Sequence, residues 1–303
     1  MRRRRFLHAA GAVFPSIVLG SELLGRSPSP ASAQSSSEQR SRRHPWQPDG
    51  WGWRGRLGLL MPATDVEPDT EFAALAPEGV STHPMRVRWH GVTRSYGVVT
   101  RGSPEAARSF AEPPEIDDAA ELLAEIRPGA IGFCFTSSSF VLGPNGDGAL
   151  KARLEARTRG IPVAITCLAA VSALRAFGAR RMALIHPPWF PEPRTHLGAE
   201  YFKQQGFDVV YNARAPLRND RGNIHPGPLY EWARASVPRE AEAVFFGGNG
   251  MRTIGAIQAL EETLRKPVLT SNQVTFWQAL GLANIAARVD GYGQLFEKPA
   301  PRG

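Results

Sequence analysis

Cysteine is scarce in this sequence, and its scarcity limits the folds and sites that the chain can form. Two cysteines in 303 residues exclude a disulfide framework and a zinc site with four cysteine ligands. The chain also lacks the charge-rich, apolar-poor composition of a disordered protein, because 42% of its residues are hydrophobic and 21% are charged. Its length exceeds the ~100–200 residues of a usual single domain, so we expect two lobes or one large domain with a buried core.

The sequence has no dense basic segment of the kind that binds nucleic acids. The net charge is +8, but half of that surplus lies within residues 1–33. After this segment the densest basic run is Arg40, Arg42 and Arg43. Arginines scattered among acidic residues are typical of a solvated surface, so we expect no nucleic-acid partner.

The first residues carry the pattern of a secretion signal. Residues 3–7 (RRRFL) precede an apolar stretch up to Leu24, and residues 31–33 (ASA) form the small-residue pattern that a signal peptidase cleaves. The twin arginine resembles the export type that carries folded proteins. An uncleaved membrane anchor is the alternative, but the interrupted apolar stretch falls short of the ~20 residues of a span. We expect residues 1–33 to be a twin-arginine-type signal, residues 34–53 a disordered linker, and the mature protein periplasmic and free of the membrane.

From Arg56 onward, short apolar segments alternate with segments of helical periodicity. The pattern predicts strands over 57–61, 85–89, 130–134, 162–166, 182–186, 208–211, 243–246 and 267–270, and helices over 117–126, 150–159, 169–177, 194–205, 228–235, 253–264 and 274–280. Gly160, Gly178 and Gly206 follow helices and lead into strands, as C-terminal stops do. Alternation of helices with almost continuously apolar strands predicts an α/β fold whose parallel sheet is covered on both faces.

Two turns that follow predicted strands are candidate binding elements, because ligands of parallel sheets bind beyond the carboxyl ends of the strands. The hydroxyl-rich residues 135–139 (FTSSS) follow one strand, and residues 247–250 (GGNG) follow another. Such donors suit a carboxylate or an enediolate. The alternative is that the serines only cap a helix and the glycines only form a tight turn.

The sequence contains no nucleotide-binding or metal-binding fingerprint. Residues 247–250 lack the glycine spacing of a Rossmann turn and the Lys-Ser/Thr of a P-loop, and no two histidines have the spacing of metal ligands on a helix. We therefore expect no cofactor and no metal. His186 ends a predicted strand and is a candidate acid/base group, because histidine titrates near neutral pH. A structural, hydrogen-bonded histidine is the alternative.

A family resemblance extends from about Arg56 to Phe296. Its most specific stretches are GLLMP at 58–62, FTS at 135–137, ALRAFG at 173–178, GNGMRT at 248–253, KPV at 266–268, FW at 276–277 and GYGQLF at 291–296. In these motifs the sequence resembles the aspartate/glutamate racemase superfamily, in its arylmalonate decarboxylase and maleate cis-trans isomerase branch. The resemblance implies two similar lobes, residues 54–168 plus 271–303 and residues 169–270, each with a mostly parallel sheet and helices, and an active-site cleft between them.

The resemblance also implies a cofactor-independent decarboxylase or isomerase that acts on a small carboxylic or dicarboxylic acid. The residues that it implies for substrate binding are Thr136, Ser137, Gly248, Asn249 and Gly250. Hydroxyl and backbone N–H donors of this kind stabilise the negative charge that develops when a carboxylate leaves. The oligomeric state is left open.

The sequence departs from the family at the positions of the family's two cysteines. The first falls on Phe135 and the second on Gly248. Cys134 lies one residue before Phe135, and a shift of one residue along a strand turns a side chain to the opposite face. Cys167 follows a different strand, and we expect both thiols to be free.

An enzyme with this sequence needs another proton carrier in place of the thiols. Asp65 occupies a position where isomerases of the family carry asparagine, and the tyrosine of the family's decarboxylase falls on Pro188. The candidates are Asp65, His186 or a water molecule. The alternative hypothesis is an exported, non-catalytic carboxylate-binding protein that keeps only the anion-binding turns.

Overall fold

The computed structural model describes residues 52–89, 92–95, 98–101, 104–218, 224–286 and 288–302. These residues belong to one compact unit. The predicted signal over residues 1–33 and nearly all of the predicted linker over residues 34–53 lie outside the described residues. Both therefore stay predictions.

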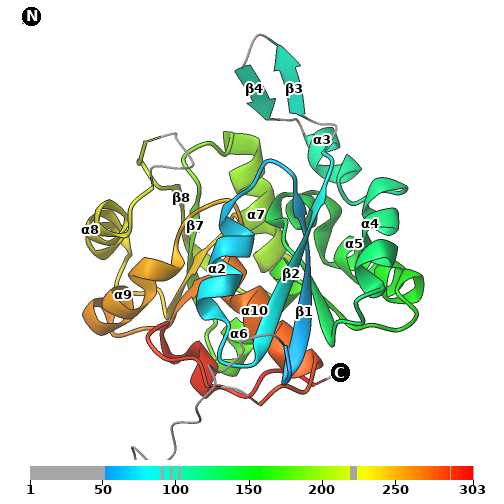
Figure 1. Ribbon diagram of the computed structural model, residues 1–303. Coiled ribbons are helices and arrows are strands. Elements are labelled where there is room, and N and C mark those ends of the chain that lie inside the picture. Colours follow the sequence, from blue (N-terminus) through cyan, green and yellow to red (C-terminus); the bar gives the residue numbers. More distant parts are fainter. Residues whose placement is uncertain are drawn as a thin grey trace, which may run out of the picture. The chain divides into compact units, whose positions relative to one another are not determined.

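Two parallel four-stranded sheets form the framework (Figure 1). The first has the strand order β2-β1-β5-β6 and the second β10-β9-β7-β8. The first sheet consists of β1 (Gly55–Pro62), β2 (Val80–Val87), β5 (Ala130–Phe133) and β6 (Val163–Ile165), and the second of β7 (Arg181–His186), β8 (Asp208–Arg214), β9 (Ala243–Phe246) and β10 (Val268–Thr270). The predicted α/β fold with two lobes is confirmed.

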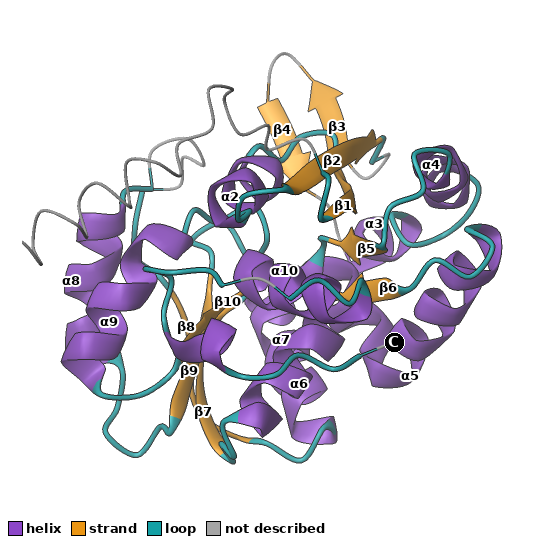
Figure 2. Cartoon of the chain, turned by 60° about the horizontal axis from the view of Figure 1, so that its bottom comes forward, coloured by secondary structure: helices purple, strands orange, loops and turns teal. Residues whose placement is uncertain are grey.

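Helices flank both sheets, and two of them lie between the sheets (Figure 2). They are α2 (Glu67–Leu75), α3 (Pro104–Ser109), α4 (Glu115–Ala124), α5 (Thr136–Arg157), α6 (Thr166–Ala176), α7 (Glu192–Gln204), α8 (Pro226–Ser236), α9 (Ile257–Leu264) and α10 (Ser271–Leu282). α6 contacts β6 and β10, and α10 contacts β5, β6 and β10. The chain thus leaves the first sheet after β6 and returns to it with α10. The lobe boundaries at residues 168 and 270 stay predictions.

Most strands of the two sheets are buried because both faces of each sheet are covered, whereas the edge strands β2 and β8 are partly exposed. In β1 all residues from Leu57 to Pro62 are buried, and so are all residues of β5 and β9. Nearly continuous apolar runs are what such strands require, which explains why each predicted strand is present. β2 begins five residues before the predicted segment 85–89, in a stretch with His83 and Pro84 that carries little apolar signal.

Several elements were predicted only in part or not at all. Helix α5 begins at Thr136, where the sequence predicted a turn, and is kinked at Gly143 (φ 72°) in front of Pro144. The first half of this helix was not predicted, because glycine and proline both disfavour a helix interior. α2, α3 and a two-stranded hairpin of β3 (Val92–Ser95) and β4 (Val98–Arg101) were also missed; the hairpin projects beyond the first sheet (Figure 1).

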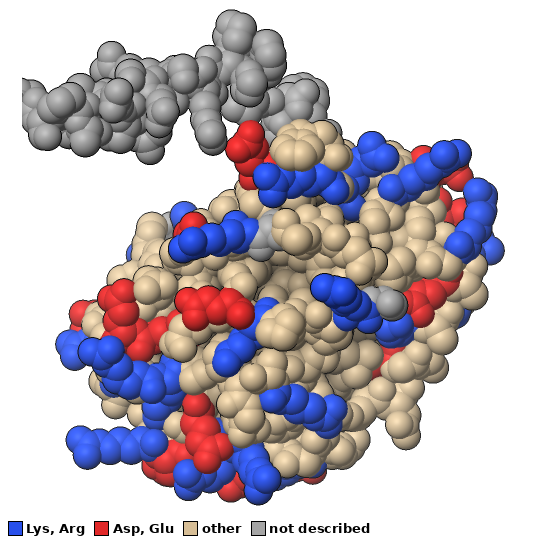
Figure 3. Space-filling view, turned by 90° about the horizontal axis from the view of Figure 1, so that it is seen from below, with Lys and Arg blue, Asp and Glu red and all other residues tan. Residues whose placement is uncertain are grey.

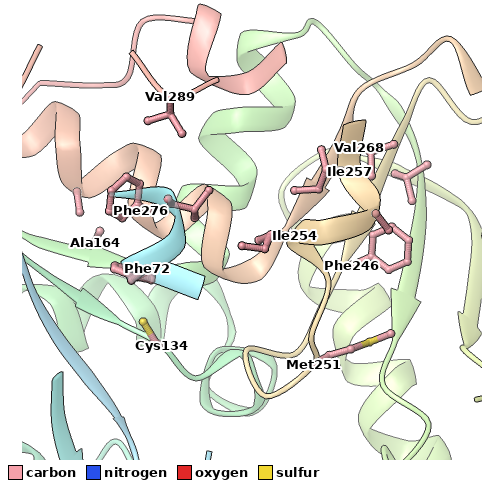
Figure 4. Close-up of a cluster of buried hydrophobic side chains, with 14 of the residues drawn as sticks. Phe72, Cys134, Ala164, Phe246, Met251, Ile254, Ile257, Val268, Phe276 and Val289 are labelled. Carbon is pink, nitrogen blue, oxygen red and sulfur yellow. The ribbon is translucent and has the colours of Figure 1, made fainter. Parts of the chain in front are cut away.

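One hydrophobic cluster continues from the first lobe into the second (Figure 4). Phe72 of α2 packs edge-on against Phe276 of α10, with the ring centroids 5.2 Å apart. Phe246 at the end of β9 and Met251 and Ile254 beyond it belong to the same cluster. The two lobes therefore share a core, and side-chain packing sets their relative position.

Charged side chains of both signs are intermixed on the face of the molecule seen in Figure 3. Surface ion pairs of the described residues include Arg157–Glu121 (2.8 Å) and Arg181–Glu242 (3.2 Å). Within the described ranges, no helix has the length and apolar character needed to cross a membrane.

Candidate active site

A narrow cleft lies between the two lobes, where loops follow the carboxyl ends of strands from both sheets. It is lined by Asp65, Trp89, Phe135, Thr136 and Ser137 of the first lobe and by Trp189, Phe190, Arg194, Gly248, Asn249 and Gly250 of the second. The structure thus brings the two predicted turns together and adds Asp65 to them. It does not bring His186 to the cleft.

The hydroxyl turn is the beginning of helix α5. The backbone N–H of Thr136 donates a hydrogen bond to Asn249 Oδ1 of the other lobe, at 2.9 Å. Among the described residues, the N–H of Ser137 and the hydroxyls of Thr136 and Ser137 have no hydrogen-bond partner. Both side chains are buried at the cleft, so these donors are available to a ligand.

The glycine turn after β9 requires glycine for its shape. Gly248 has φ 98°, and a Cβ atom on it would lie 2.3 Å from Cγ of Pro187. The N–H of Met251 donates to the carbonyl of Gly248 and closes the turn. Within the part of the chain that the structure describes, the N–H groups of residues 248–250 have no partner. Consecutive free N–H groups of this kind are suited to an anion.

The side chain of Asn249 joins the two turns instead of pointing free donors at a ligand. Its Oδ1 accepts from the N–H of Thr136, and its Nδ2 donates to Thr166 Oγ1 (3.2 Å) and Asn272 Oδ1 (2.9 Å). All of its polar atoms are therefore occupied. Of the predicted binding groups of Asn249, only the backbone N–H remains for a substrate.

Glu71 of helix α2 extends this network into the first lobe. Its Oε2 accepts from Asn272 Nδ2 (2.8 Å), and its Oε1 accepts from the N–H groups of Thr253 (2.7 Å) and Ile254 (3.1 Å). Burial raises the pKa of Glu71 to about 7, and these three hydrogen bonds oppose the rise. A carboxyl of the first lobe thus holds the segment that follows the glycine turn of the second.

Two residues of opposite charge line the cleft. Asp65 follows β1 and is 3% exposed, and Arg194 lies in the first turn of α7 and is 4% exposed. The guanidinium carbon of Arg194 lies 5.1 Å from the ring centroid of Phe190, and burial lowers the pKa of the guanidinium. Arg194 was not among the candidate site residues predicted from the sequence. The only sequence feature that sets it apart is its basic side chain in the first turn of a helix, where the helix dipole favours an acidic residue.

Aromatic side chains form the walls of the cleft and nearly close it. Phe135 packs against Trp89 and Phe110 of the first lobe, with centroid distances of 5.1 Å and 4.7 Å. Trp189, which is half-buried, and Phe190 form the opposite wall. The space between them is about 10 Å³, roughly the room of one water molecule. A ligand therefore enters only when a wall side chain moves.

His186 is a buried structural residue one layer behind the cleft wall. Its ring packs against Phe140 and Phe190, and its Nε2 is hydrogen-bonded to Asn212 Oδ1 at 2.8 Å. Burial lowers the pKa of His186 to about 4, so the ring is neutral at neutral pH. His186 does not line the cleft, so the structure gives no support to its predicted acid/base role, which stays a prediction.

Cys134 and Cys167 are free thiols, as expected, and both are buried away from the cleft. Burial raises the pKa of each thiol, which keeps both protonated. Cys134 lies in the core shared by the lobes (Figure 4). The next residue, Phe135, belongs to a separate cluster of the first lobe. Among the described residues no group of three or more His, Cys, Asp or Glu side chains is placed to hold a metal ion.

Comparison with known proteins extends these observations. A maleate isomerase from Geobacillus stearothermophilus is 26% identical over 255 residues, which cover 79% of this chain and 96% of that protein. The arylmalonate decarboxylase of Bordetella bronchiseptica is 28% identical over 170 residues, covering 54% of this chain and 69% of the decarboxylase. A crystal structure of the maleate isomerase of Pseudomonas putida S16 with maleate has a TM-score of 0.69, at 24% identity, and covers 80% of this chain and 98% of the isomerase chain.

The family model for arylmalonate decarboxylase matches residues 108–296, which is more than half of the chain. Both lobes take part in the match, since it runs from α3 to the segment that follows α10. The protein therefore belongs to the arylmalonate decarboxylase family, in the branch of the aspartate/glutamate racemase-like fold that also holds the maleate isomerases.

Proposed function

We propose that the protein is a cofactor-independent decarboxylase or isomerase of a small carboxylic or dicarboxylic acid. The observation that carries the proposal is the convergence of donors from both lobes on one cleft. Thr136 and Ser137, with their hydroxyls and the N–H of Ser137, line it from the first lobe, and residues 248–250, with their N–H groups, line it from the second. Donors fixed in place before the reaction stabilise charge as it develops on a carboxylate or an enediolate.

Decarboxylation is the reaction that these groups support best. When the bond between the α-carbon and one carboxylate breaks, carbon dioxide leaves and the electron pair passes into the remaining carboxylate as an enediolate. The donors of the two turns hold that dianionic group. A proton then moves to the α-carbon, and the carboxyl group of Asp65, which lines the cleft, is the side chain that we assign to this step.

The proposal is tested by proton exchange in deuterated water. Purified protein is offered phenylmalonate, maleate and aspartate, and deuterium incorporation at carbon is followed by NMR. We expect exchange or turnover with at least one acid, and a loss of about 10²–10⁴-fold in Asp65→Asn, the usual contribution of a general acid. A Thr136→Ala/Ser137→Ala double variant serves as the control without the hydroxyls. Exchange no faster than in that variant would refute the proposal.

A second candidate is a non-catalytic carboxylate-binding protein. One observation and one prediction favour it. The aromatic walls leave about 10 Å³ of space, and the resemblance predicts that the family's two cysteine positions fall on Phe135 and Gly248. Calorimetry with the same acids separates the candidates. Binding without conversion would support the second candidate, and conversion of any bound acid would exclude it.

We also propose that the protein is exported through its twin-arginine-type signal over residues 1–33. The support is the order of basic, apolar and small residues in that segment. A reporter fused to residues 1–33 is expected in the periplasm of a bacterial host, and to stay in the cytoplasm when Arg3 and Arg4 are replaced by lysine. Export that survives this change would contradict the twin-arginine assignment.

A further inference from the structure

Asn272, in the first turn of helix α10, lies behind the glycine turn. It is 1% exposed and is not one of the residues that line the cleft. Its Oδ1 accepts from Asn249 Nδ2 at 2.9 Å, and its Nδ2 donates to Glu71 Oε2 at 2.8 Å and to the carbonyl oxygen of Asn249 at 3.0 Å. A side-chain amide has two N–H donors, and both are in use here. Any effect of Asn272 on a ligand therefore passes through Asn249.

The hydrogen bond to the carbonyl of Asn249 fixes the direction of the next N–H group. The peptide bond between Asn249 and Gly250 is trans and planar, so its C=O and its N–H point in opposite directions. The C=O points at Asn272, which lies outside the lining of the cleft, so the N–H of Gly250 points toward the cleft that Gly250 lines. Among the described residues this N–H has no hydrogen-bond partner. A free donor that is held in a fixed direction is suited to stabilise a carboxylate oxygen.

Glu71 determines which end of the Asn272 amide lies on which side. Its Oε1 accepts from two backbone N–H groups of the segment that follows the glycine turn, so this oxygen must be an acceptor. Above its pKa of about 7 the whole carboxylate only accepts, and Oε2 therefore requires the Nδ2 end of Asn272. The Oδ1 end is then available to Asn249 Nδ2, and Asn249 Oδ1 accepts from the N–H of Thr136. Glu71 thus sets the donor and acceptor roles as far as the hydroxyl turn.

We propose that Asn272 is a positioning residue of the candidate active site, which holds the Asn249–Gly250 peptide so that the N–H of Gly250 points at the bound acid. Glu71 supports this task by fixing the orientation of the Asn272 amide. The inference rests on the proposed function, because it assigns a role in ligand binding at that site. Loss of the Asn272 amide should weaken binding of an acid without removing any group that touches the acid.

Two neighbouring amides of helix α10 test the inference without any need for turnover. Asn272→Ala removes the amide that holds the carbonyl of Asn249. Gln273→Ala is the matched control, because Gln273 is also fully buried and its Nε2 also donates to a backbone carbonyl, that of Tyr292 at 2.7 Å, but it does not line the cleft. Dissociation constants of phenylmalonate, maleate and aspartate are measured by calorimetry at about pH 8, where Glu71 is ionised, and stability is measured by urea denaturation.

The two variants should be alike in stability and different in affinity. Each leaves a buried carbonyl without its donor, so we expect both to be less stable than the wild-type protein. Asn272→Ala should bind the acid about 10- to 100-fold more weakly, because a hydrogen bond to a charged group accounts for a factor of that size. Gln273→Ala should change the affinity by less than about threefold, because its side chain contacts the C-terminal segment and not the glycine turn.

A double variant separates the carbonyl contact from the rest of the network. In Glu71→Gln/Asn272→Asp the new amide at position 71 donates to the new carboxylate at position 272, which still accepts from Asn249 Nδ2. The same carboxylate has no donor for the carbonyl of Asn249. We expect this double variant to be more stable than Glu71→Gln alone and to bind the acid as weakly as Asn272→Ala. It also serves if Asn272→Ala does not fold.

The outcomes distinguish this inference from the proposed function. If Asn272→Ala or the double variant binds the acid as tightly as the wild-type protein, the inference is wrong, whether or not the protein is an enzyme. Equal losses of affinity in Asn272→Ala and Gln273→Ala, or binding of no acid by the wild-type protein, also overturn it. If the affinity depends on Asn272 but no acid is converted, the inference stands and the non-catalytic candidate gains support.

Discussion

Glu71 provides a sharp test of the hydrogen-bond network that holds the two lobes at the cleft. It is 3% exposed and accepts three hydrogen bonds, from Asn272, Thr253 and Ile254. Burial raises its pKa from 4.5 to about 7, which corresponds to about 3 kcal/mol at 1.36 kcal/mol per pKa unit. We therefore expect the protein's stability to depend on the proton of this one carboxyl.

The direction of the effect follows from proton linkage. Between pH 4.5 and about 7 the folded protein keeps the proton on Glu71, whereas the unfolded chain has lost it. The folded state therefore binds more protons in this window, and its stability falls as the pH rises. The contribution is fully present below pH 4.5 and is lost as the pH passes through about 7.

The perturbation is Glu71→Gln, which removes the titration and keeps the size of the side chain. The free energy of unfolding is measured by urea denaturation, followed by tryptophan fluorescence, at several values between pH 4.5 and 8. The advantage of the wild-type protein over the variant should shrink by about 3 kcal/mol across this range. Glu262→Gln, at an exposed position of α9, controls for the loss of one carboxylate. A difference between wild type and Glu71→Gln that does not change with pH would refute the reasoning.

Three further predictions concern the cleft and the residue behind it. Gly248→Ala, with φ 98° and a Cβ atom 2.3 Å from Pro187, should abolish binding of the acids in calorimetry while circular dichroism still reports a folded protein. Asn249→Ala leaves the N–H of Thr136 and Oδ1 of Asn272 without partners, and urea denaturation should show a loss of about 2–6 kcal/mol, at ~1–3 kcal/mol per buried group. Because burial lowers the pKa of His186 from its ordinary 6.5 to about 4 in the folded protein, His186→Gln should reduce the loss of stability that acidification from pH 6.5 to 4 causes. An unchanged slope of stability against pH would contradict the burial of the ring.

The sequence was sufficient to predict the framework because the framework depends on local patterns. Apolar runs such as Leu57–Met61 and Ala243–Phe246 predicted buried strands, and these runs became β1 and β9. Helix α5 shows the limit of the same reasoning. Its first turns contain a threonine and three serines, and Gly143 and Pro144 interrupt its course, so that local propensity favoured a loop. Packing against α3 and α7 overrode that propensity.

The site was predictable only where its donors belong to a short segment with a recognisable local pattern. Thr136 and Ser137 lie at the start of a helix and Gly248 requires a positive φ, which are properties of short segments. The roles of Asn249 and Arg194 were not predictable in this way. Oδ1 of Asn249 accepts a hydrogen bond from the N–H of Thr136, which lies 113 positions away in the chain. Arg194 reaches the cleft because α7 packs beside α5. Such contacts exist only after both lobes have formed.

The return of α10 to the first sheet has a consequence for biosynthesis. Because α10 packs on β5 and β6, the first lobe lacks this covering helix until residues 271–282 have been made. The first lobe therefore completes its packing only after the second lobe has been synthesised.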